Sequence, residues 1–194
     1  MTETTNGVQA MIDTLVGDIR RILRDAPASA PMLAALTERL APLAEDTSWI
    51  GDDLYETDAT QGFGISILHE EPDDGFLLET VCWEPGRGVA PHDHQTWGVV
   101  MGLTGEEINV DWRRVDDGAQ PGRASLEQAG ETVVTGGVVK TFRPDDIHSI
   151  RNDSDGPSLS LHLYGRSLAK TDRSEFNPLA GTVVPCPKRV RRTG

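Results

Sequence analysis

Cysteine is scarce in this chain, and its scarcity excludes the sites and folds that depend on many thiols. Cys82 lies in an apolar run and Cys186 lies between two prolines. Two isolated cysteines provide neither a disulfide framework nor a Cys-x-x-Cys zinc site. The chain therefore has to rely on an ordinary apolar core, for which 194 residues are sufficient.

Basic charge and long apolar runs are also scarce. The chain has 18 Lys and Arg against 31 Asp and Glu, a net charge of -13, which argues against a nucleic-acid partner. No apolar run is long enough to span a bilayer, and the N-terminus lacks the layout of a signal peptide. We expect a cytoplasmic protein without a membrane partner. The basic residues 188–192 are interpreted as a solvated, frayed tail.

The first part of the chain has the apolar spacing of helices. One amphipathic helix is predicted from a cap at Asn6, and a second begins after Ser29 with Pro31 in its first turn and ends near Glu45. Both are expected to cover one face of the domain that follows. We assign residues 1–61 to this helical extension.

From about Gly62 the chain consists of short apolar segments separated by Gly, Pro and Asp clusters. Strands are predicted over residues 65–69, 76–83, 96–103, 108–114, 125–129, 131–135, 137–142, 148–152 and 159–164. Many short strands with no helices between them are typical of an all-β sandwich or barrel. We assign residues 62–178 to the barrel and residues 179–194 to an irregular C-terminal tail.

Histidines are the candidate metal ligands. His92 and His94 are one residue apart on an extended segment, which directs both imidazoles to the same face. The other histidines are His69, His148 and His162, and a turn before His148 would bring it beside an earlier strand. His69 is interpreted as a surface strand residue. Histidine nitrogens bind iron, zinc, copper and nickel, so the residues alone leave the metal open.

These histidines belong to a wider pattern that resembles the cupin superfamily. The pattern consists of His92-x-His94, Gly105, Gly137, Pro144, His148 and Asn152. The resemblance implies a double-stranded β-helix, or jelly-roll barrel. In that family a glutamate usually stands four residues after the second histidine, where this chain has Gly98. The implied metal ligands are therefore His92, His94 and His148, with no carboxylate.

The end of the predicted barrel resembles one branch of this superfamily, the thiol dioxygenases of the cysteine dioxygenase type. Ser160, His162 and Tyr164 alternate on one strand and match the Ser-His-Tyr array of those enzymes. The stretch Cys82-Trp83-x-Pro-Gly is also similar, and the resemblance covers about residues 62–178. It implies a mononuclear Fe(II) site that adds both atoms of O2 to a thiol, giving a sulfinate. His162 would then bridge Ser160 and Tyr164 and orient the phenol toward the metal site.

The resemblance is greatest to the bacterial 3-mercaptopropionate dioxygenases. Animal cysteine dioxygenases carry a cysteine after the histidine pair, which cross-links to the tyrosine, whereas this chain has Gly98-Val99. Arg173, nine residues beyond Tyr164, matches the arginine that binds the substrate carboxylate, and a guanidinium suits a carboxylate through two parallel hydrogen bonds. Arg166 is a weaker rival for this role.

The early strand departs from these relatives. The positions that carry an Arg or Gln in them fall on Ser66 and Gly64, and Gln61 could substitute only if the loop shifts. The pocket is therefore expected to differ, and cysteine or mercaptosuccinate are alternatives to 3-mercaptopropionate as the substrate.

Two other classes stay open. One is a metal-dependent cupin isomerase or hydrolase that does not use O2, since zinc with three histidines and a water favours hydrolysis or hydration. The other is a non-catalytic ligand-binding sensor, against which the array of Ser160, His162 and Tyr164 argues. The expected partners are a small thiol carboxylate and O2, and the expected state is a monomer or small homo-oligomer.

Overall fold

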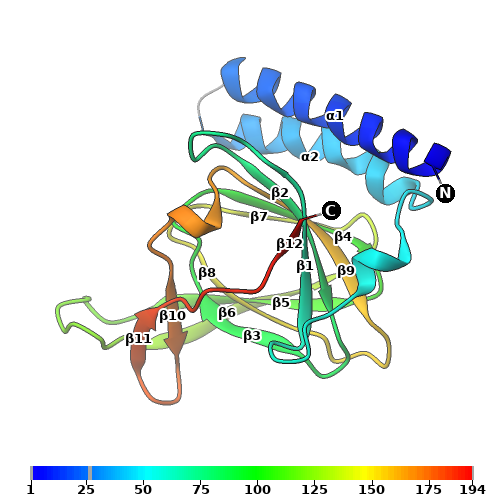
Figure 1. The fold of residues 1–194 in the computed structure, drawn as a ribbon. Coiled ribbons are helices and arrows are strands. Elements are labelled where there is room, and N and C mark those ends of the chain that lie inside the picture. The colour runs from blue at the N-terminus through cyan, green and yellow to red at the C-terminus, as the bar shows by residue number, and fades with distance from the viewer. Residues whose placement is uncertain (1, 26–27, 194) are drawn as a thin grey trace.

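Two helices lie over a barrel made of two β-sheets (Figure 1). The computed structural model describes residues 2–25 and 28–193. The helical elements are α1 (Thr2–Asp25), α2 (Ala30–Glu45) and the short 3-10 helices η1 (Asp52–Tyr55) and η2 (Leu168–Lys170). The strands are β1 (Phe63–Glu70), β2 (Leu77–Trp83), β3 (Gly88–His92), β4 (Gly98–Thr104), β5 (Glu107–Arg114), β6 (Leu126–Val134), β7 (Val139–Phe142), β8 (Ile147–Arg151), β9 (Ser158–Tyr164), β10 (Ser174–Asn177), β11 (Thr182–Pro185) and β12 (Arg192–Thr193).

The strands form two six-stranded sheets. Their orders are β12-β1-β2-β9-β4-β7 and β11-β10-β3-β8-β5-β6. The strand pairs within these sheets are antiparallel, apart from the parallel pair of β12 with β1. The prediction of a mostly β barrel with two N-terminal helices is confirmed.

The helices have the predicted amphipathic character. The Ser29 hydroxyl accepts a hydrogen bond from the Met32 N–H at 3.4 Å, and Pro31 lies in the first turn of α2, as expected for a helix start. The start predicted for the first helix is wrong, because α1 already begins at Thr2 and includes Asn6. Threonine and glutamate before Asn6 are also residues that begin helices well, so the cap was not unique. In the described part of the chain, no helix is long and apolar enough to cross a membrane.

The central strands of the first sheet are buried on both faces, and their inner faces direct side chains into the barrel. Every residue of β9 is buried. Because side chains alternate along a strand, Leu159, Leu161 and Leu163 face the helices and pack in one cluster with them. The intervening Ser160 and His162 therefore face the interior of the barrel. The helices thus cover the outer face of a strand whose inner face carries polar residues.

Two strands that were predicted to be separate form one strand in the structure. Residues 125–129 and 131–135 were expected to be separate strands, but they form the single strand β6. Gly130 lies inside β6 opposite Asp111, next to a shift in register with β5. A glycine at such a bulge does not end a strand, so it gave a false turn signal.

The irregular C-terminal tail is also a wrong prediction. Strand β11 pairs with β10, and β12 pairs with β1 on the opposite sheet. The basic cluster is not a frayed tail either: the Arg192 guanidinium donates to the Ser66 hydroxyl at 3.1 Å, and Arg189 pairs with Glu175 at 2.8 Å. Acidic and polar groups of the barrel hold this basic segment, which the chain's overall negative charge favours.

Candidate metal centre and its cavity

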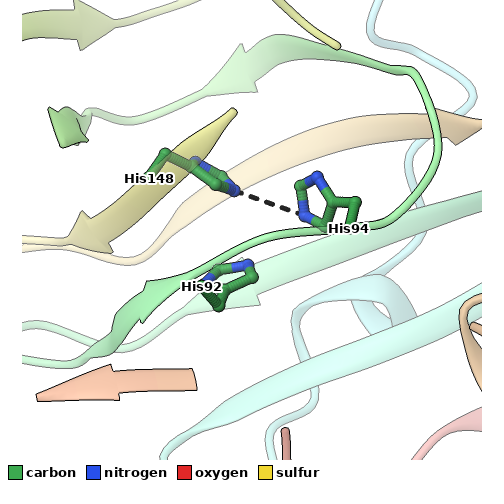
Figure 2. Close-up of side chains that lie close together, drawn as sticks. All are labelled: His92, His94 and His148. Carbon is green, nitrogen blue, oxygen red and sulfur yellow. Dashed lines mark hydrogen bonds between the residues drawn. The ribbon is translucent and has the colours of Figure 1, made fainter. Parts of the chain in front are cut away.

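Strand pairing brings two of the predicted ligands together. His92 is the last residue of β3, and its partner in the register of β8 is His148. His94 was expected on the same strand, but the strand ends at His92. The segment continues along β10 instead, where the Asp93 N–H donates to the Ser174 carbonyl at 3.2 Å and the Ser174 N–H donates to Asp93 Oδ1 at 2.9 Å. His94 is therefore still directed toward the other two histidines (Figure 2).

The three imidazoles lie at a spacing that suits one metal ion. Their ligand nitrogens are all within 4.8 Å of one another, and the Nε2 atoms of His94 and His148 are 3.3 Å apart. Two histidine nitrogens that bind one ion at about 2.0–2.1 Å with a tetrahedral angle would be separated by about 3.3 Å. His92, His94 and His148 could therefore hold a metal ion.

Hydrogen bonds fix which nitrogen two of the rings present. The Nδ1–H of His148 donates to Asn109 Oδ1 at 2.7 Å, and the Nδ1–H of His92 donates to the Ala90 carbonyl at 2.9 Å. This arrangement leaves the Nε2 lone pair of each ring available to a metal. Asn109 was not predicted from the sequence.

The environment keeps these ligands neutral. Burial lowers the pKa of His92 to about 4 and lowers the pKa of His94 and of His148 well below the usual value; neighbouring positive groups lower all three pKa values further. Neutral imidazole is the form that binds metals. Among the described residues, the group that could hold an ion consists of these histidines, with no carboxylate.

The predicted Ser-His-Tyr array is continuous. Ser160 Oγ and His162 Nε2 are 2.9 Å apart, and His162 Nδ1 and the Tyr164 hydroxyl are 2.8 Å apart. The Tyr164 ring lies against His94, with ring centroids 4.6 Å apart. The array thus runs through the interior to the edge of the histidine cluster.

Gly98 provides room for the tyrosine. It lies opposite Tyr164 in the strand register, and a Cβ atom there would be 3.0 Å from Cδ1 of the ring. Cys82 belongs to the cluster formed with the helices, and burial raises its thiol pKa to about 11. Neither position therefore places a thiol beside the Tyr164 ring.

A cavity of about 50 Å³ connects the histidines with a basic wall. The three candidate ligands, His162 and Tyr164 line one part of it. Arg173, Arg189 and Arg191 line another part. Arg173 makes no side-chain hydrogen bond or ion pair with the part of the chain that the structure describes. Its guanidinium is therefore available to a ligand.

Arg166, the rival to Arg173, does not line this cavity. Its guanidinium lies 3.5 Å from Asp74 on the surface. Gln61 does not reach the cavity either, because its side chain bonds to the backbone of Phe63 and Val190. Gly64 could not carry a longer residue in this arrangement, since a Cβ there would be 1.9 Å from the Glu56 carbonyl.

Four charged residues near the site were missed. Arg189 and Arg191 come from the basic cluster that was expected to be solvated. Glu79 is 2% exposed, lines the cavity with an oxygen 3.8 Å from Arg191 Nε, and has its pKa raised to about 7 by burial. Glu107 is 1% exposed and accepts a hydrogen bond from Ser160 at 2.9 Å. A single acid inside an apolar strand was the available signal for Glu79, whereas Glu107 follows Glu106 at the start of a mixed strand and had no such signal.

Comparison with known proteins finds similar barrels. No protein-family model matches the chain. An oxalate oxidase in complex with the substrate analogue glycolate is 17% identical with a TM-score of 0.43, and the match covers 60% of this chain and 59% of that one. An uncharacterised Klebsiella pneumoniae protein with a double-stranded β-helix domain is 13% identical with a TM-score of 0.46, over 68% of this chain and 93% of that one.

A cupin superfamily protein from Desulfitobacterium hafniense is also similar. It is 14% identical with a TM-score of 0.42, and the match covers 65% of this chain and 89% of that one. The chain spans about three fifths of the oxalate oxidase that it matches. These likenesses concern the arrangement of strands and carry no chemistry to this chain.

Proposed function

We propose that this protein is a mononuclear iron thiol dioxygenase that converts a small thiol carboxylate, most simply 3-mercaptopropionate, into its sulfinate. The observation that supports this proposal is one small cavity with three neutral histidines, Tyr164 and Arg173 in its walls, where Arg173 has no side-chain partner among the described residues. The histidines could hold the metal, and the arginine could hold a carboxylate. An isomerase, a hydrolase or a sensor requires no such combination.

The proposed metal is Fe(II) on His92, His94 and His148. Bound by neutral ligands alone, Fe(II) would keep its full charge, attract a thiolate and supply the one-electron chemistry that reaction with O2 requires. The contribution of the chain is to exclude water and to orient the reactants. A cavity of about 50 Å³ has room for roughly four water molecules, which suits a ligand of a few non-hydrogen atoms.

Arg173 is the proposed carboxylate-binding residue. Two parallel charge-assisted hydrogen bonds from its guanidinium would fix one end of the substrate, while the thiolate faces the histidines. The reaction then balances without a further reductant, because a thiolate and O2 together contain all the atoms of the sulfinate product. The sulfur is oxidised and both oxygen atoms are reduced.

The basic wall formed by Arg173, Arg189 and Arg191 favours mercaptosuccinate over cysteine as a second candidate substrate. Arg189 and Arg191 add positive charge beside Arg173, although each has an acidic neighbour. A second carboxylate would be attracted by this wall, whereas the ammonium group of cysteine would face three guanidiniums. The expected order of preference is 3-mercaptopropionate, then mercaptosuccinate, then cysteine.

Oxygen uptake tests the proposal. Purified protein loaded with Fe(II) should consume O2 when 3-mercaptopropionate is added, and with ¹⁸O2 the sulfinate should carry two heavy oxygen atoms by mass spectrometry. A His148→Ala protein treated in the same way is the control for adventitious iron. Absence of sulfinate from all three thiols would overturn the proposal, and zinc or manganese in protein purified without added metal would favour an isomerase or hydrolase.

The cytoplasmic location, the O2 and thiol partners and the monomeric or small homo-oligomeric state stay predictions. Size-exclusion chromatography with light scattering measures the last of these.

A further inference from the structure

A buried acid extends the Ser-His-Tyr array. Glu107 on β5 accepts a hydrogen bond from Ser160 at 2.9 Å, so the array becomes a chain of three hydrogen bonds, Glu107–Ser160–His162–Tyr164. All four residues are at most 3% exposed. The chain begins at a strand of one sheet, crosses to β9 of the other, and ends where Tyr164 lines the cavity.

The hydrogen bonds of this Glu107–Ser160–His162–Tyr164 chain can be donated in either of two directions, depending on where the protons are. Burial lowers the pKa of His162 to about 3, so its ring is neutral and carries one N–H at neutral pH. If Glu107 is ionised, it can only accept, and Ser160 must donate to it. The Ser160 oxygen then accepts from His162 Nε2–H, and His162 Nδ1 accepts the proton of Tyr164. The tyrosine hydroxyl proton thus points away from the cavity.

Protonation of Glu107 allows every link to reverse. Glu107 donates to Ser160, Ser160 donates to His162 Nε2, and the His162 Nδ1–H donates to the Tyr164 oxygen. The hydroxyl proton of Tyr164 is then free to point into the cavity. Protonation of Glu107 therefore decides whether the Tyr164 hydroxyl proton points to His162 or into the cavity.

We propose that Glu107 is a positioning residue that sets the direction of this hydrogen-bond chain. In its protonated form it makes Tyr164 a donor toward the cavity, and in its ionised form it turns the Tyr164 proton back to His162. The role of the donor form in thiol oxidation rests on the proposed function, whereas the direction of the chain does not.

The surroundings of Glu107 allow both forms near neutral pH. Burial raises its pKa to about 7, and contacts with Ser160 and Trp83 lower it only in part. The proton that reverses the chain is carried by Oε2, the oxygen that faces Ser160, and within the described residues Oε1 has no hydrogen-bond partner. Opposite Glu107 on the paired strand β6 is the apolar Val134.

Other titratable and charged groups share the interior but do not set this pKa. They are His162 and Tyr164 on β9, Glu79 on β2, the histidines His92, His94 and His148, and the cavity arginines Arg173, Arg189 and Arg191. None of them is among the causes of the pKa shift of Glu107. Glu79 also has its pKa raised to about 7 and lies opposite His162 in the register of β2 with β9, so the Glu107→Gln variant is needed to assign a transition near pH 7 to Glu107.

The ring tautomer of His162 tests the inference without any measurement of activity. ¹⁵N chemical shifts of histidine-labelled, zinc-loaded protein distinguish Nδ1–H from Nε2–H, and a His162→Asn protein assigns the signal. We expect Nδ1–H at about pH 5.5 and Nε2–H at about pH 8.5. Glu107→Gln should abolish this pH dependence, and Glu106→Gln, a change at the exposed neighbouring acid, should retain it. A wild-type tautomer that is the same at both pH values would overturn the inference.

A pH profile of the loaded enzyme gives the functional readout. The ratio of kcat/KM for wild type to that for Glu107→Gln should fall about tenfold per pH unit above pH 7, as for the loss of one essential proton. Ser160→Ala interrupts the hydrogen-bond chain between Glu107 and His162, so its kcat/KM should also lack the decrease above pH 7 that is expected for wild type. A tautomer switch in a protein that oxidises no thiol would leave the inference standing and reject the proposed function. An active enzyme without the switch would do the reverse.

Discussion

Replacement of Glu107 by glutamine should stabilise the folded protein at alkaline pH but not at acid pH. In the folded state the carboxyl has its pKa raised from 4.5 to about 7, because burial disfavours the charged form. Below pH 4.5 it is neutral in both the folded and unfolded states, and burial of its charge costs nothing. Above pH 7 it is ionised in both states, and the folded state carries the full desolvation penalty.

The size of the effect follows from the two pKa values. A difference of about 2.5 units at about 1.36 kcal/mol per unit gives a penalty of about 3 kcal/mol above pH 7. Wild type therefore has about 3 kcal/mol more folding stability below pH 4.5, where the carboxyl is neutral, and loses it as the pH rises through about 7. Glutamine carries no charge, so the stability difference between variant and wild type should become about 3 kcal/mol more favourable between pH 4 and pH 8.

Urea unfolding followed by tryptophan fluorescence can measure this change, since the chain contains four tryptophans. Both proteins should be stripped of metal, so that the buried histidines contribute equally to each and cancel in the difference. Glu106→Gln is the matched control and should show no such dependence on pH, because Glu106 is exposed. If the stability difference for Glu107→Gln is the same at both pH values, the reasoning about its buried charge is refuted.

Three further changes test the site. His148→Ala should reduce bound metal to background in elemental analysis and remove the increase in Tm that added metal gives wild type. Arg173→Gln should raise KM for 3-mercaptopropionate about 10- to 100-fold, the value of a lost charge-assisted pair, whereas Arg166→Gln should change KM less than about twofold. Equal effects of the two arginine changes would contradict the carboxylate role. Gly98→Ala places a Cβ 3.0 Å from the Tyr164 ring and should lower kcat at little loss of Tm; unchanged kcat would show that the ring moves freely.

The local pattern of the sequence determined the parts of the site that lie on one element. Ser160, His162 and Tyr164 alternate on β9, and a period of two is enough to direct them to one face. The cap at Ser29 and the apolar spacing of α2 are equally local. The pair His92 and His94 was also predictable as a chelate, although the strand ends at the first histidine and a contact with β10 maintains the direction of the second.

Tertiary structure alone decided which residues from distant parts of the sequence contact these elements. Glu107 reaches Ser160 from a strand 53 residues earlier, and His148 meets His92 through the register of β8 with β3. Arg191 lines the cavity because the C-terminal segment returns along β1. Such contacts depend on sheet register and chain return, which are set by packing between distant residues and leave no period in the sequence. The sequence thus determined the candidate metal-binding pair and the alternation of polar and apolar side chains on β9, while the fold decided which acids and cations surround them.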